Sequence, residues 1–174
     1  MSVKLIGATV NRVEDPRLLT GRGHFVDDVH LPGMLHAAFL RSVVPHGRIL
    51  GIDTAEAAAL PGVVAVFTAA DLDGTCAPLR QQGPPGLRTP LFTVLATDRV
   101  RFVGDPVALV VAESRYLAED ACDLIDIEIE PLAAVISPAD ALDAGAPHLY
   151  DDLADNLAYE GDFDYGDVGP RRQR

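Results

Sequence analysis

The stretch RVRFVGDPVALVVAESRYLAEDACDLIDIEIE, residues 99–130, decides the fold of this chain. Its two apolar runs, 99–103 and 106–112, flank a Gly-Asp pair and predict two strands joined by a turn. Ser114 is a favourable helix N-cap, and the apolar residues after it recur on one helical face. Residues 126–130 alternate carboxylates with isoleucines, which is typical of a half-buried strand. This order of elements predicts a small sheet with a helix packed on it.

The segments farther from this stretch indicate the same class of fold. Short apolar runs predict further strands over 24–29, 34–42, 48–53 and 63–67. A helix over 55–60 and a capped helical turn after Thr68 complete the pattern. The mixed order of strands and helices predicts an α+β fold, a mixed sheet with three or four short helices packed on it. The run 135–142 is similar to 66–72, because in each an apolar segment ends in a hydroxyl residue with an aspartate three residues later. This similarity indicates either an internal duplication or independent use of the same capping chemistry.

We expect three parts along the chain. Residues 1–23 are punctuated by Asp-Pro and Gly-x-Gly and predict an irregular N-terminal lead-in. Residues 24–150 predict the folded domain, in which the segment 73–98, rich in glycine and proline, is a long loop. Residues 151–174 lose periodicity and predict an extended acidic tail that wraps its own domain, a partner or nothing.

The composition argues against several classes of partner and reaction. The 174 residues carry a formal net charge of -12, include 6% aromatic residues and lack tryptophan. Such a charge repels phosphates and anionic lipids, so we expect neither nucleic acid nor a membrane as partner. Lys4 is the only lysine, which argues against a carrier domain with a lipoyl or biotinyl lysine. Two isolated cysteines, no run of about 18 apolar residues and no signal peptide predict a cytoplasmic protein.

No residue pattern predicts a catalytic, cofactor-binding or metal-binding site in this chain. The histidines His24, His30 and His36 are spaced too widely for paired metal ligands, and the tail aspartates do not match an EF-hand. Gly21 and Gly23 lack the third glycine and the following helix of a dinucleotide fingerprint. We therefore expect the chain by itself to be inactive.

Several long runs, in one order and register, resemble a known protein family. They are RVEDPRLLTGRGHFVDD (12–28), LPGMLHAAFLRS (31–42), ALPGVVAVFT (59–68), VGDPVA (103–108), AEDA (118–121) and EPL (130–132). They resemble the N-terminal part of molybdenum hydroxylase large subunits, the xanthine dehydrogenase and aldehyde oxidase family that includes the carbon monoxide dehydrogenase large chain. The PRLLTGRG form is most similar to the carbon monoxide dehydrogenase type.

The resemblance implies that residues 24–150 form an a/b hammerhead domain, which precedes the molybdopterin-binding region of the same subunit. In that family the molybdenum cofactor, the substrate pocket and the base glutamate belong to this later region, and we expect the tail to stop before it. The resemblance therefore places no cofactor in this chain. It implies molybdopterin in the full subunit, with iron–sulfur and flavin (FAD) subunits as partners.

A structural, subunit-assembly role follows from this resemblance, with the molybdopterin-binding region as the first partner. The alternative is a stand-alone protein-interaction module from a split or degenerate gene. The chain could also form a homo-oligomer. A long loop in a compact domain is usually functional or partner-bound, or else disordered. A proline at the start of a strand removes one N–H donor from the ladder of hydrogen bonds. The interface candidates chosen on these grounds are Gly83, Pro84, Pro85, Gly86, Gly104, Asp105 and Pro106.

Overall fold

The computed structural model describes residues 6–162 and 165–166. Its contacts divide the chain into two units, Met1–Met34 and Leu35–Arg174. The predictions that concern Lys4 and the last part of the tail lie outside the described residues.

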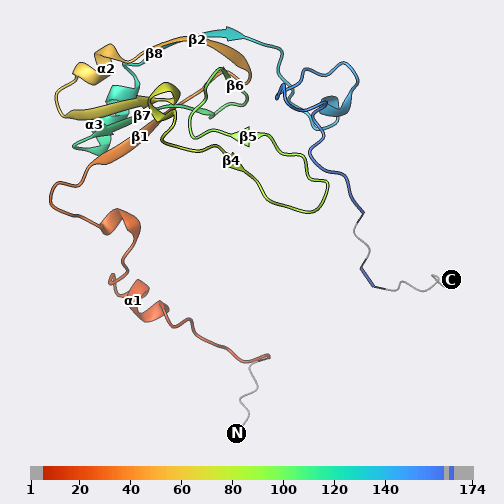
Figure 1. Cartoon of the computed structure of the whole chain (residues 1–174). Helices are drawn as coiled ribbons and strands as arrows, with labels where there is room; N and C mark the ends of the chain where they lie inside the picture. Colours follow the sequence, from red (N-terminus) through yellow and green to blue (C-terminus); the bar gives the residue numbers. More distant parts are fainter. Residues whose placement is uncertain (1–5, 163–164, 167–174) are drawn as a thin grey trace. The chain divides into compact units, whose positions relative to one another are not determined.

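The first unit contains two short helical segments, α1 (Asp15–Leu19) and the 3₁₀ helix η1 (Val26–Asp28) (Figure 1). Helix α1 lies where irregular backbone was expected, and the proline in its first turn favours a helix start because its missing N–H is not needed there. The strand predicted over 24–29 is wrong. The Asp28 carboxylate accepts a hydrogen bond from the Phe25 N–H (2.9 Å) and closes a turn instead.

The second unit contains small antiparallel sheets (Figure 1). One sheet has the order β1-β7-β3, formed by β1 (His36–Arg41), β7 (Pro106–Ala112) and β3 (Val63–Thr68). Another has the order β6-β2-β8, formed by β6 (Arg99–Val100), β2 (Gly47–Asp53) and β8 (Asp126–Pro131). The long loop also contains a two-stranded hairpin, formed by β4 (Leu79–Arg80) and β5 (Leu91–Phe92).

Helix α3 (Arg115–Cys122) packs on the β1-β7-β3 sheet (Figure 1). Ser114 caps it as predicted, because its Oγ accepts a hydrogen bond from the Leu117 N–H (3.2 Å). The short helix α2 (Ala55–Ala59) contacts both α3 and β3. The buried residues of this first core are Ala57, Ala108, Val110, Ala112, Ala118, Ala121, Cys122 and Ile125.

The second core involves one face of the β6-β2-β8 sheet. Its fully buried members Val100 and Val107 are packed against Ile49, Ile127 and Ile129. The other side of β8 carries exposed carboxylates, so the half-buried strand predicted from the alternating pattern is confirmed.

The α+β class is confirmed, but the arrangement of the sheets differs from the prediction. All strand pairs among the described residues are antiparallel, so small antiparallel sheets replace the single mixed sheet. The strands predicted on either side of Gly104 belong to two sheets and form no hairpin with each other. The Gly104 N–H donates to the Ser42 carbonyl (2.8 Å), and the Ser42 N–H donates to the Asp105 carbonyl (2.9 Å). The turn therefore pairs with the end of β1, which separates the two strands.

The capped turn after Thr68 forms as predicted. It is the 3₁₀ helix η2 (Ala69–Leu72), closed by the Asp71 carboxylate, which accepts from the Thr68 N–H (2.7 Å). The echoing run 135–142 has no strand, and although the Ser137 hydroxyl accepts a hydrogen bond from the Ala139 N–H (3.2 Å), the 3₁₀ helix η3 (Asp140–Leu142) of this run does not have the capping box of η2. The shared sequence pattern therefore does not produce a repeated structural unit.

Candidate functional site

The first interface candidate, Gly104–Pro106, is tied to the end of β1. Gly104 has φ +96°, which glycine adopts without strain, and its carbonyl accepts a hydrogen bond from Arg41 Nη1 (3.0 Å). Pro106 pairs with Arg41 at a register shift, where its missing N–H costs no regular ladder bond. The candidate residues are half-buried, so the turn is built into the fold.

Asp105 holds this turn in shape. Its carboxylate accepts a hydrogen bond from the Arg101 N–H (2.9 Å). Burial raises the pKa of the Asp105 carboxyl, while this hydrogen bond and the charge of Arg101 act in the opposite direction. The contacts of this carboxylate therefore support a positioning role in the turn.

Exposed apolar side chains surround the turn. Val43 is 86% exposed, Val103 is 64% exposed and Phe102 is 51% exposed. They lie on the two segments that the backbone hydrogen bonds join, and Arg41 lies over the nearby Phe39 ring at 5.4 Å from its centroid. A group of exposed apolar side chains with a cation at its edge is typical of a protein contact surface.

The second interface candidate, Gly83–Gly86, is the exposed tip between β4 and β5. A Cβ at Gly83 would meet the flexible end of the Leu87 side chain, whereas Gly86 has φ +90°, a conformation that favours glycine where the chain turns back. At the base of the hairpin, Arg80 Nη1 donates to the Thr89 carbonyl (2.8 Å), and Thr89 Oγ1 donates to the Gln81 carbonyl (3.3 Å). The tip is therefore presented by an ordered hairpin. The hydrogen bonds at its base join residues of the hairpin itself, whereas those of the Gly104 turn join it to Arg41 and Arg101.

Residues 147–158, which we call the C-terminal clasp, fold back onto the long loop and β6. Arg88 Nη2 lies 2.8 Å from Asp155 Oδ1, and Arg99 Nη2 lies 2.7 Å from Asp151 Oδ2. Asp151 and Asp155, in the segment predicted to be an acidic tail, thus contact arginines of the same chain, and the extended tail over 151–174 stays a prediction.

Arg101, which follows β6, contacts the clasp, and 18% of its side chain is exposed. Its Nε donates to the Leu149 carbonyl (2.9 Å), and its guanidinium carbon lies 4.8 Å from the Tyr150 ring centroid. Burial alone would raise the pKa of Asp98, but the hydrogen bond from Arg99 and the charges of Arg101 and Arg99 hold that pKa below its ordinary value. The clasp is therefore held by charge and hydrogen bonds.

The sequence reasoning did not find the clasp or its organising amide, Asn156. The Asn156 Nδ2 donates to the carbonyls of Pro147 (2.9 Å) and Ala141 (3.2 Å), and its Oδ1 accepts from the Leu149 N–H (3.1 Å). A lone asparagine carries no periodic signal. Charge was the sequence signal that could have predicted the clasp, because arginines recur over 80–101 and the later tail is acidic.

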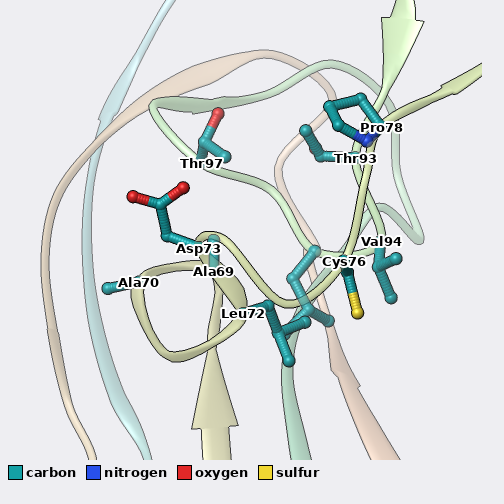
Figure 2. A pocket seen from close by; sticks show the side chains of 10 residues that line it. Ala69, Ala70, Leu72, Asp73, Cys76, Pro78, Thr93, Val94 and Thr97 are labelled. Carbon is teal, nitrogen blue, oxygen red and sulfur yellow. The ribbon is translucent and has the colours of Figure 1, made fainter.

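A cavity of about 440 Å³ lies between η2 and the returning arm of the long loop. Figure 2 shows Asp73 and Thr97 on one side of it and Cys76 with Val94 on another. Cys76 is an exposed free thiol, whereas Cys122 is buried in the first core as predicted.

The family of the chain follows from comparison with known proteins. Residues 20–133 match the family model described as aldehyde oxidase and xanthine dehydrogenase, a/b hammerhead domain. The chain belongs to this family. The predicted resemblance and the hammerhead fold are therefore confirmed.

Several relatives resemble this hammerhead chain over most of its length. The nicotine 6-hydroxylase large subunit of Paenarthrobacter nicotinovorans is 46% identical over 94% of the chain and 20% of its own length. Quinoline 2-oxidoreductase from Pseudomonas putida 86 superposes with a TM-score of 0.81 and 45% identity, covering 88% of the chain and 20% of that protein chain. The Cu,Mo-CO dehydrogenase structure superposes with a TM-score of 0.74 and 44% identity, covering 87% of the chain and 19% of that protein chain. The hammerhead chain thus spans about a fifth of the length of these relatives.

The side chains that line the described cavities offer no Arg or Lys to the phosphate of a molybdopterin cofactor. Charged donors bind phosphate best, whereas the 440 Å³ cavity is lined by the carboxylate of Asp73, by two threonine hydroxyls and by no Arg, Lys or His. A second cavity, of about 340 Å³, is lined partly by the clasp; Asp143, Asp155 and His148 are among its lining residues, again without Arg or Lys.

Among the described residues, the structure has neither a cluster of metal ligands nor a helix that could cross a membrane. No group of three or more His, Cys, Asp or Glu side chains within residues 6–162 and 165–166 could hold a metal ion. His46 is buried, and its Nδ1 lies 2.7 Å from the Ala133 carbonyl oxygen, as suits a core histidine. Across the same part of the chain, no helix has the length and apolar character to cross a bilayer.

Proposed function

We propose that this hammerhead chain is a structural and assembly domain of a molybdenum hydroxylase large subunit and has no catalytic site of its own. The observation that carries the proposal is the match of residues 20–133 to the hammerhead family, in relatives about five times as long as the chain. The cavities support it, because the side chains that line them offer no Arg or Lys to the cofactor phosphate.

In this proposal the rest of the large subunit holds molybdopterin and oxidises or hydroxylates a small substrate. Iron–sulfur and flavin subunits carry the electrons away, and the complex is cytoplasmic. The hammerhead chain contributes contact surfaces, for which the Gly83–Gly86 tip and the Gly104–Pro106 turn are the candidates, because both are held in shape by their own hydrogen bonds.

The test is to mix this chain with the nicotine 6-hydroxylase large subunit from which the matching N-terminal part has been removed. We expect an equimolar complex by size-exclusion chromatography with light scattering, and molybdenum only in the larger piece. The matched control is the removed N-terminal part of that relative, which must rebind if the larger piece is folded. Rebinding of the control without binding of this chain would contradict the proposal.

A further inference from the structure

Strand β7 has two apolar faces, and only one of them is covered by α3. On the α3 side, Ala108, Val110 and Ala112 are completely buried in the first core. On the other side, Val107 is buried in the second core, whereas Leu109 and Val111 are half-buried and belong to neither core. A strand that is apolar on both faces is typical of a sheet covered on both sides.

The strands on either side of β7 continue this second apolar surface. Phe39 and Phe67 both pair with Leu109, and Ala37 and Ala65 both pair with Val111. Phe39 remains 43% exposed. We call the surface formed by these side chains the open face, and its members are Ala37, Phe39, Ala65, Phe67, Leu109 and Val111.

We propose that the open face is the surface on which the rest of the large subunit docks, which deepens the proposed function and rests on it. The chain spans 20% of the nicotine 6-hydroxylase large subunit, so most of that polypeptide is present to supply an apolar layer. The six side chains of the open face are all apolar, although the chain has a net charge of -12, and the structure places one cation, Arg41, over the Phe39 ring. The open face therefore matches an apolar partner surface.

A second copy of the chain is a poorer occupant. Stable interfaces between separate proteins take roughly 20–30 residues a side, many more than the open face offers. Two copies with a net charge of -12 each would also repel one another. The rest of the large subunit would contact the Gly104 turn and the hairpin tip as well, so the open face would be the apolar centre of a larger contact.

Charged substitutions on β1 test this docking surface. Phe39→Glu and Ala37→Glu place a charge on exposed positions of an edge strand, where we expect the fold to tolerate it. Leu50→Glu is the control, because Leu50 is 54% exposed but lies on the other sheet. Phe39→Leu keeps the surface apolar. Circular dichroism and thermal unfolding verify that each variant is folded.

The readout is the dissociation constant for the truncated nicotine 6-hydroxylase large subunit, measured by calorimetry. We expect Phe39→Glu and Ala37→Glu to weaken binding on the order of 30-fold or more, as for residues at the centre of an interface. Leu50→Glu and Phe39→Leu are expected to stay within about 3-fold.

Three results would overturn the docking surface, and they are distinguishable. Wild-type binding by both β1 variants would refute the open face and leave the proposed function intact. No binding of the parent chain, while the relative's own N-terminal part rebinds, would refute both. A dimer of the parent chain in sedimentation that Phe39→Glu makes monomeric would assign the open face to a second copy.

Discussion

The first core and the C-terminal clasp are stabilised by different interactions. The core joins β1, β7, β3 and α3 through apolar side chains that are mostly inaccessible to water. The clasp joins arginines of the long loop and β6 to residues 52 and 67 positions later through ion pairs and carbonyl contacts. Apolar burial contributes most of the stability of a domain, whereas exposed ion pairs contribute little. The clasp should therefore open while the core stays folded.

The largest expected effect separates the two faces of β7. Val110→Asp places a charge in the first core, where the side chain is fully buried. The unpaired buried charge should lower the free energy of unfolding by more than about 4 kcal/mol and leave the chain largely unfolded. Far-UV circular dichroism and urea unfolding measure this.

The neighbouring residue supplies the control. Val111→Asp puts the same charge on the half-buried open face, where water reaches the side chain. Its cost should be about 1 kcal/mol, within the range of strand preferences. Equal losses for the two variants would mean that the open face is as closed as the core.

The next effect concerns a buried residue in the long loop. Leu95 is 1% exposed, although its segment was predicted to be an irregular loop. Leu95→Ala should lower the free energy of unfolding by about 2–5 kcal/mol, as in a core. Its neighbour Val94 is 43% exposed, and Val94→Ala should change it by less than about 1 kcal/mol. Chemical unfolding compares the pair, and a small effect at Leu95 would place this part of the loop outside the stable core.

The sequence predicts the core better than the clasp because the two carry different kinds of signal. Helix α3 and strand β8 follow from periodicity and a serine cap, which act between residues close in the chain. The capped turn at Thr68 follows from the same local chemistry. The pairing of Phe39 and Phe67 with Leu109 depends on segments far apart in the chain, so the sheet order was not predictable.

The candidate site shows the same division. The turn at Gly104 and the tip at Gly83 follow from glycine, which permits backbone conformations closed to other residues, and from proline, which restricts them; both effects are local. The role of Asn156 depends on carbonyls of the 141–149 segment, and the open face depends on a register that brings three strands together. Neither has a signature within one short segment.

A smaller effect is expected in the clasp itself. Arg101→Gln removes the contacts with Leu149 and Tyr150 and should destabilise the clasp by about 1 kcal/mol. Hydrogen exchange of the clasp amides should then accelerate about fivefold, with no change in the exchange of β7. Arg88→Gln should accelerate it less, because that side chain is 40% exposed and its ion pair is more screened.

The matched control for the clasp is an ion pair elsewhere. Arg48 lies 3.3 Å from Glu130 between β2 and β8. Arg48→Gln should leave the exchange of the clasp unchanged. If Arg101→Gln instead accelerates exchange throughout β7, the clasp and the core form one cooperative unit.

The smallest effect is the response of the clasp to pH. The pKa of Asp155 is lowered by the hydrogen bond from the Leu157 N–H and by Arg88, and that of Asp98 is lowered by its arginine neighbours despite its burial. A lowered pKa in the folded state means that the stabilisation is complete above the ordinary aspartate value of about 3.9 and is lost as the pH falls through the folded-state value. We expect the clasp amides, relative to those of β7, to lose protection only below about pH 4. Asp98→Asn should flatten this dependence, because its amide does not titrate, and a loss of protection beginning near neutral pH would show that other groups hold the clasp.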